Sequence, residues 1–169
     1  MNYLTTAQTI RISKVLLMLY ISIFGLLVMY SNFTDYPTNY EYLGHILSMD
    51  TVRADTLYKY RAITSPMAHH RIYWLIITLE VLSTCFCVIG TYHLYKHIHS
   101  SAKKFHEAKK FALIGLLIAL AIYYVGFQVI GNEWFNMDES DSWNYKDWAR
   151  HIVDFIMPLM IYLALRIER

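Results

Sequence analysis

A single acidic residue, Glu80, lies inside one of the longest apolar stretches of this sequence, the run from residue 72 to 95. In a helix starting at residue 72, its carboxyl would lie about 12 Å along the axis from the nearer end. A carboxyl at such depth is costly, which makes it a candidate for ligand binding, ion handling or catalysis. The alternative is a neutral or paired carboxyl that only fixes how helices pack. The sequence leaves both interpretations open.

Small and polar residues recur around Glu80 at helical spacing. The stripe consists of Tyr73, Ser83 or Thr84, Cys87 and Thr91. We expect it to face the interior of a helix bundle. Gln128 and Asp154 fall about one turn inside the ends of two further apolar runs, so with Glu80 they would line an outward-opening polar cavity. For Asp154 the favoured interpretation is a helix N-terminal position, where its charge suits the dipole.

Histidines, acids and arginines gather in the segments 31–71 and 131–150. The candidate ligand-binding residues are Glu80, His45, Asp50, Arg61, His69, His70, Glu133, Trp134, Asn144, Arg150 and Asp154. Imidazole and carboxylate are ligands for transition metals, and His45, His69 and His151 are the metal candidates. Because no known ligand spacing occurs, polar caps or headgroup contacts are the favoured role. Arg61 and Arg150 are candidate partners for Glu80, Glu133 or Asp154, or ordinary loop arginines in screened surface pairs.

Catalytic motifs do not accompany these residues. The sequence has no nucleophile elbow, Gly-rich phosphate loop or Ser/His/Asp pattern, and no cofactor can be named from it. Cys85 and Cys87 are two residues apart, so on a helix they face different ways and are expected to be free thiols. His93 and His97 have metal-compatible spacing, but with the neighbouring lysines they favour a basic face that meets anionic lipid. Nucleic-acid binding has no support.

Four apolar runs must position all of these side chains. Apolar residues make up 56% of the 169-residue chain and charged residues 17%, against about 25% charged in a soluble domain. The runs cover residues 12–30, 72–95, 111–130 and 151–167, and each suits a helix of about 20 residues that crosses a membrane. We therefore expect an all-α membrane protein, a four-transmembrane-helix bundle forming one domain over residues 1–169.

Charge gives the expected orientation. The segment 96–110 holds five lysines against one glutamate, and both ends of the chain are basic, whereas 131–150 holds five acids against two bases. Basic connections stay in the cytoplasm. Both termini are therefore expected to be cytoplasmic, with outer loops at about 31–71 and 131–150.

The first outer loop is too long to be structureless. Its residues 40–49 are expected to form a short helix that lies on the membrane or caps the bundle. In the second loop, Trp134, Trp143 and Trp148 suit interfacial anchoring. Gly115 and Gly126, in the third apolar run, are expected to be close-packing positions.

Several blocks in order resemble one known family. They are HILSMDT at 45–51, YRAITSPMAHH at 60–70 followed by Glu80, FHEAK at 105–109, GFQVIGNEWFNM at 126–137, SWN at 142–144 and AR at 149–150. The chain resembles the bacterial family of small integral membrane proteins described as domain of unknown function 2165. The resemblance implies a multi-pass protein of the bacterial inner membrane and carries no activity with it.

The sequence departs from that family pattern at Asp138, Glu139, Tyr145 and Lys146, which makes the second outer loop more acidic. The leading hypothesis is a non-enzymatic accessory or interaction subunit. Its partners would be membrane lipid and either a larger membrane complex or a second copy of the chain. The alternative is a ligand- or metal-binding site, or a small membrane enzyme, at the outer mouth of the bundle around Glu80.

Overall fold

The computed structural model describes residues 4–168, and this part of the chain is helical without strands. In chain order the elements are α1 (Thr6–Thr34), α2 (Tyr36–Ser48), the 3₁₀ turn η1 (Lys59–Arg61), α3 (Pro66–Lys96), α4 (Ala102–Glu107), α5 (Lys110–Leu120), the π-helix η2 (Ala121–Trp134), the 3₁₀ turn η3 (Met137–Glu139) and α6 (Lys146–Ala164). The predicted all-α class is therefore confirmed.

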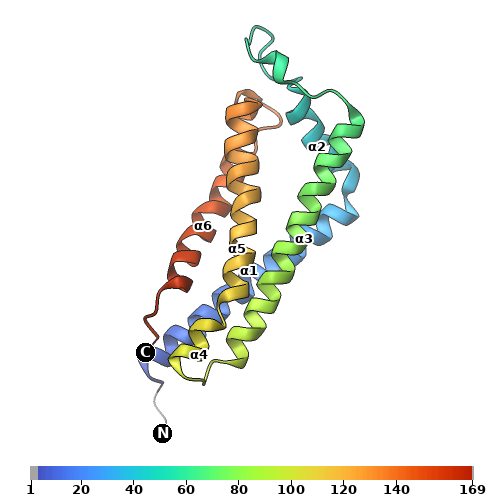
Figure 1. Cartoon of the computed structure of the whole chain (residues 1–169). Coiled ribbons are helices and arrows are strands. Elements are labelled where there is room, and N and C mark those ends of the chain that lie inside the picture. The colour runs from blue at the N-terminus through green and yellow to red at the C-terminus, as the bar shows by residue number, and fades with distance from the viewer. Residues whose placement is uncertain (1–3, 169) are drawn as a thin grey trace.

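The long helices run side by side along the molecule (Figure 1). Both termini and α4 lie at one end, which we call the basic end because it carries the lysines of segment 96–110. The opposite end holds α2 and the two long connections; we call it the acidic end, after the five acids of segment 131–150.

Three helical stretches are long and apolar enough to cross a membrane: Thr6–Thr34, Pro66–Lys96 and Ala102–Trp134. The last combines α4, α5 and η2. The fourth predicted crossing, α6, is not among them. Its first half carries Lys146, Asp147, Arg150 and Asp154, and these four charges lower its apolar character. Length and composition thus support three of the four expected spans.

The helix boundaries differ from those expected because the helices extend into polar flanks. At the start of α1, Thr5 and Gln8 form a capping box, and α3 begins with a Ser65 cap and Pro66. The fourth helix was predicted over 151–167, which is wrong at both ends. It begins at Lys146 and ends at Ala164, after which Leu165 is extended.

The expected short helix of the first outer loop is present as α2. It begins four residues earlier than predicted, because Pro37 fits a first helical turn, and it ends at Ser48, followed by the capping residue Met49 in a left-handed conformation. Its buried residues join those of the following loops in a second core of Ile46, Leu47, Met49, Val52, Phe135 and Met137. This helix therefore packs onto the bundle at the acidic end.

Near the basic end, α3 and α5 pack at backbone distance. A Cβ added to Gly115 would lie 2.6 Å from Cys87 Sγ, and one added to Gly90 would lie 2.4 Å from the Ala112 nitrogen. Gly115 is therefore the close-packing position predicted. Gly126 is not, because the nearest atom to an added Cβ there is the Ala121 oxygen at 3.7 Å.

Candidate functional site

The carboxyl of Glu80 faces the interior of the bundle and is 8% exposed. It accepts a hydrogen bond from Nδ2 of Asn32. Oδ1 of the same asparagine accepts a bond of 2.9 Å from the Tyr73 hydroxyl. These three residues join the last turn of α1 to α3. The polar side chain that reaches Glu80 from the segment 31–71 is Asn32, whereas the candidate partners Arg61 and Arg150 make other contacts.

The polar stripe around Glu80 also faces the interior. Tyr73, Ser83, Thr84 and Cys87 are buried, and the Ser83 hydroxyl donates to the Gly115 carbonyl across the α3–α5 contact. Farther toward the basic end, Thr91 shares a hydrogen bond with Ser22 of α1. Cys85 is exposed and Cys87 buried, and both thiols are free.

Glu80 lies in the wall of a cavity of about 190 Å³ that opens between α1, α2, α3, η2 and α6. The lining residues are Val28, Ser31, Asn32, Asn39, Tyr42, Leu43, Ile46, Tyr73, Ile76, Glu80, Phe127, Tyr145 and Trp148. We call this space the Glu80 cavity. Within residues 4–168, its lining includes no basic side chain and no second carboxylate.

Aromatic rings form one side of the Glu80 cavity. Tyr42 contacts Tyr145 edge-on at a centroid distance of 5.0 Å, Tyr145 contacts Trp148 at 6.0 Å, and Trp148 contacts Phe127 at 5.9 Å. Burial, and second the neighbouring Tyr42, raise the pKa of the Tyr145 phenol, so this hydroxyl is neutral at physiological pH. We call these four rings the aromatic wall.

Two further spaces adjoin the Glu80 cavity. An apolar cavity of about 230 Å³ lies between α3 and η2 and shares Leu43, Ile46, Ile76 and Phe127 with it. A second, small space of about 30 Å³ shares Val28 and Glu80 with the Glu80 cavity. The interior at the acidic end is therefore open on two sides of Glu80.

The π-helix η2 supplies Phe127 to both larger cavities. A π-helix closes each turn with one more residue than an α-helix, and such turns are rare and frequently found at functional sites. Here the π geometry extends over Ala121–Trp134, the part of the third long helix that lines the cavities.

The other predicted site residues do not reach the Glu80 cavity. His45 Nδ1 pairs with Asp50 Oδ2 at 2.7 Å, and its ring stacks on Trp143 at 4.4 Å. The guanidinium of Arg61 lies 4.6 Å above the Trp134 ring and donates to the backbone carbonyls of Glu133 and Trp134. These contacts connect the segment 31–71 to the segment 131–150.

His69 and His70 follow the start of α3 and face different neighbours. His69 is buried, and its Nε2 lies 2.6 Å from the Ile63 carbonyl. His70 is exposed, with Nδ1 2.8 Å from the Tyr36 hydroxyl and its ring stacked on Tyr40. Both side chains form hydrogen bonds that connect helix α3 to the segment 31–71.

The remaining candidates lie at the start of α6. Asn144 is exposed, and its side-chain oxygen accepts from the Lys146 nitrogen. Arg150 and Asp154 form an exposed pair at 3.9 Å, and His151 is exposed. In residues 4–168 no three His, Cys, Asp or Glu side chains gather closely enough to hold a metal ion. His45, His69 and His151 are thus not brought together.

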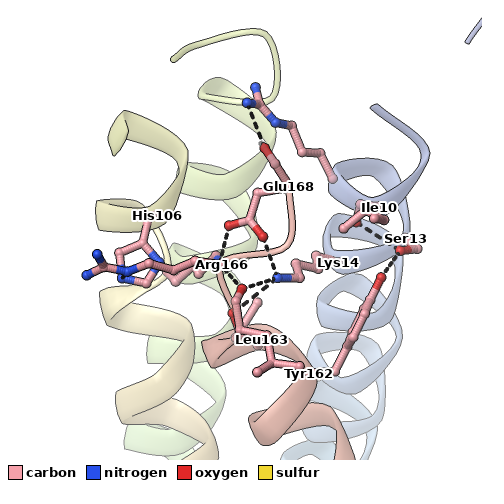
Figure 2. Close-up of polar contacts among 11 residues, drawn as sticks. Ile10, Ser13, Lys14, His106, Tyr162, Leu163, Arg166 and Glu168 are labelled. Carbon is pink, nitrogen blue, oxygen red and sulfur yellow. Dashed lines mark hydrogen bonds and ion pairs between the residues drawn. The ribbon is translucent and has the colours of Figure 1, made fainter. Parts of the chain in front are cut away.

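The basic end holds a buried charge cluster that the sequence analysis did not identify (Figure 2). Lys14 Nζ lies 2.8 Å from Glu168 Oε2, and Lys109 pairs with the other carboxylate oxygen. The three side chains are 0%, 2% and 1% exposed, in the order Lys14, Glu168 and Lys109. Burial alone would raise the pKa of Glu168, but the two lysine hydrogen bonds outweigh it and hold the pKa below its ordinary value.

Backbone carbonyls complete this cluster. Both lysines donate to the Leu165 carbonyl, at 2.7 Å from Lys14 and 2.8 Å from Lys109. Arg11 donates to the carbonyls of Ser100 and Glu168. The segment after α6 is thereby held between α1 and the α4–α5 region. The sequence signals were one acid in an otherwise basic tail and Lys14 inside the apolar run 12–30.

Long apolar helices, a buried carboxyl and polar connections at both ends define a helical integral membrane protein. The sequence profile of the family described as predicted small integral membrane protein (domain of unknown function 2165) matches residues 10–166. The chain belongs to this family, as the ordered sequence blocks indicated. No curated protein and no solved structure matches the chain.

Proposed function

We propose that this chain is a non-enzymatic, multi-pass protein of the bacterial inner membrane that binds a ligand in the Glu80 cavity. One observation carries the proposal: a carboxyl that is 8% exposed borders a cavity of about 190 Å³. A carboxyl used only to tie helices together would be enclosed by packed side chains, because protein interiors are close to crystal density. An open space beside a costly buried acid supports binding instead.

The chemistry of the lining supports binding over catalysis. The cavity offers one carboxyl, two amides and phenols, and a neutral phenol is a poor nucleophile. The described lining contains no histidine, cysteine or lysine that would pair with a nucleophile. The chemistry of the lining therefore favours a binding protein over an enzyme.

Native mass spectrometry tests the proposal. Protein released gently from membranes is expected to carry a non-protein mass. Ile76→Trp and Val28→Phe, which fill the cavity from two walls, are expected to lose this mass. Leu82→Phe is the control, since Leu82 is exposed on α3 and lines neither cavity. Retention of the mass by both filled variants, or a wild type without any, would contradict the proposal.

We propose a four-pass topology with both termini in the cytoplasm. Exposed lysines at positions 96, 103, 104 and 110 support this orientation. The course of α6 from the acidic end to the basic end supports a fourth crossing. A reporter at Lys103 and one after residue 166 should register as cytoplasmic, and one at Asp141 as external. Reporters at 141 and 166 on the same side would remove α6 from the crossings.

A role as an accessory or interaction subunit is the second candidate, favoured by the exposed tip of the first outer loop. Leu57 is 87% exposed and Tyr60 77% exposed, in a loop that projects past the helices (Figure 1). Large apolar side chains exposed together are typical of interaction sites. A photo-crosslinking residue at position 57 should join the chain to another membrane protein or a second copy. Crosslinks to lipid alone would contradict the role.

A further inference from the structure

The hydrogen bonds at Glu80 run in one direction. The Tyr73 hydroxyl donates to Asn32, and Asn32 donates to the carboxyl of Glu80. Tyr73 and Asn32 are both donors in these two bonds, so in the ionised form of Glu80 the oxygen atoms left over are acceptors: the second carboxylate oxygen and the lone pairs of the phenol. A ligand that satisfies them must bring hydrogen-bond donors or a positive charge.

The aromatic wall selects for the same charge. Aromatic rings carry negative potential on their faces and attract organic cations, Trp most strongly. Tyr42, Tyr145, Trp148 and Phe127 line the cavity that Glu80 borders. No Lys, Arg or His lines it within the described residues, so an anion would meet no counter-charge there.

An inorganic cation fits this lining poorly. Hard cations require six or more oxygen ligands, and one carboxylate among aromatic rings does not provide them. Rings beside a carboxylate instead match an ammonium that carries carbon substituents. Its charge is spread over a larger surface and its loss of water costs less.

The apolar cavity that adjoins the Glu80 cavity can hold an apolar part of the same ligand. It shares Ile46, Ile76 and Phe127 with the Glu80 cavity, and its walls come from the apolar residues of α2, α3 and η2. A hydrocarbon chain entering it would stay continuous with a head group beside the carboxyl.

We propose that the Glu80 cavity binds an amphiphile whose head is an organic ammonium and whose tail lies between α3 and η2. The proposal rests on the ligand-binding function proposed above. The carboxyl of Glu80 neutralises the head, the aromatic wall contacts it from one side, and Asn32 with Tyr73 holds the carboxyl in place.

The probe for this proposal is decyltrimethylammonium. Decanol is the comparison with a neutral head, and tetramethylammonium is the comparison without a tail. The protein, in maltoside micelles, carries 5-fluorotryptophan, and Trp148→Phe assigns the wall signal in the ¹⁹F NMR spectrum. Decyltrimethylammonium should shift the Trp148 signal to saturation, and decanol should not. Tetramethylammonium should bind more weakly because it leaves the apolar cavity empty. Trp74, exposed on α3, reports nonspecific partitioning.

Glu80→Gln keeps the acceptor for Asn32 and removes the charge. It should weaken binding of decyltrimethylammonium about tenfold or more. Asp154→Asn, the matched control at an exposed acid, should stay within about twofold. If Glu80→Gln does not fold, Tyr145 provides a second test: Tyr145→Leu should weaken binding about threefold or more, and Tyr145→Phe should not.

The outcomes separate the two proposals. If decanol saturates Trp148 as well as the cation does, and Glu80→Gln affects neither, the ammonium inference is overturned while ligand binding stands. Equal binding of tetramethylammonium and decyltrimethylammonium would overturn the assignment of a tail. If no probe reaches saturation and the native protein carries no bound mass, both proposals fail.

Discussion

At the basic end, the carboxylate of Glu168 is enclosed by two lysine ammonium groups, whereas at the acidic end the carboxyl of Glu80 has one amide donor and a cavity beside it. Both carboxyls are nearly inaccessible to solvent. A buried charge that is paired on both oxygens needs nothing further, while one with an unused oxygen facing a cavity is available to a ligand. Burial alone therefore does not identify a site.

The packing of the helices also differs between the basic end and the acidic end. Toward the basic end, α3 and α5 meet at Gly90 and Gly115 with no room for a methyl group. Toward the acidic end, α3 and η2 are separated by a cavity of about 230 Å³. The close α3–α5 contact holds the helices in position relative to one another. The cavity between α3 and η2, in the half of the bundle toward the acidic end, is the space where we place the ligand.

The largest expected effect follows from removing the buried acid at the basic end. Glu168→Ala leaves Lys14 and Lys109 buried without their counter-charge, so we expect a loss of about 3–5 kcal/mol in unfolding free energy. Denaturation in mixed micelles measures it. Glu107→Ala, an exposed acid on α4, is the control and should change stability by at most about 0.5 kcal/mol. Equal stability of the two variants would show that the cluster is not buried.

The next effect compares two glycines of one helical stretch. In Gly115→Ala the new methyl would overlap Cys87 and Ser83 of α3, so a loss of about 1–3 kcal/mol is expected. Gly126→Ala, in η2, meets only ordinary contacts and should be neutral or slightly stabilising. The same denaturation assay reports both. A larger loss at Gly126 would contradict this difference in packing between the basic end and the acidic end.

Low pH should reduce the stability that the charge cluster of the basic end contributes. The folded-state pKa of Glu168 lies below its ordinary value, so its ionised form stabilises the fold above the unfolded-state pKa. This contribution is lost as pH falls through the folded-state pKa. Stability measured from neutral pH down to the acid limit should therefore decline less in Glu168→Gln than in wild type. Parallel declines would show that other carboxyls dominate.

Much of the fold follows from the sequence, because apolar runs and loop charge determine where helices lie and which ends meet. The stripe of Tyr73, Ser83 and Cys87 was also predictable, since helical spacing places it on one face with Glu80. Helix ends were less predictable. The run 151–167 gave no sign that the fourth helix starts at Lys146.

The partners of the buried carboxyls were not predictable. Asn32 was assigned to a loop, because the apolar run ends at Tyr30, whereas α1 continues to Thr34. Glu168 pairs with Lys14 across 154 positions of sequence, and no local pattern records such a distance. Lysines near helix ends suggest only cytoplasmic flanks, so their role as internal counter-charges requires the tertiary structure.

The smallest expected effect concerns the exposed pair of Arg150 and Asp154 at the acidic end. Their atoms are 3.9 Å apart, and the side chains are 66% and 64% exposed. Arg preceding Asp by four residues is also the weaker order for a helix pair. A double-mutant cycle with Arg150→Ala and Asp154→Ala should give a coupling of about 0.5 kcal/mol or less. A coupling above about 1.5 kcal/mol would mean that this surface is shielded from solvent in the assembled protein. The pair would then resemble the enclosed charges of the basic end, and a partner covering the start of α6 would be the explanation to test by crosslinking at Arg150.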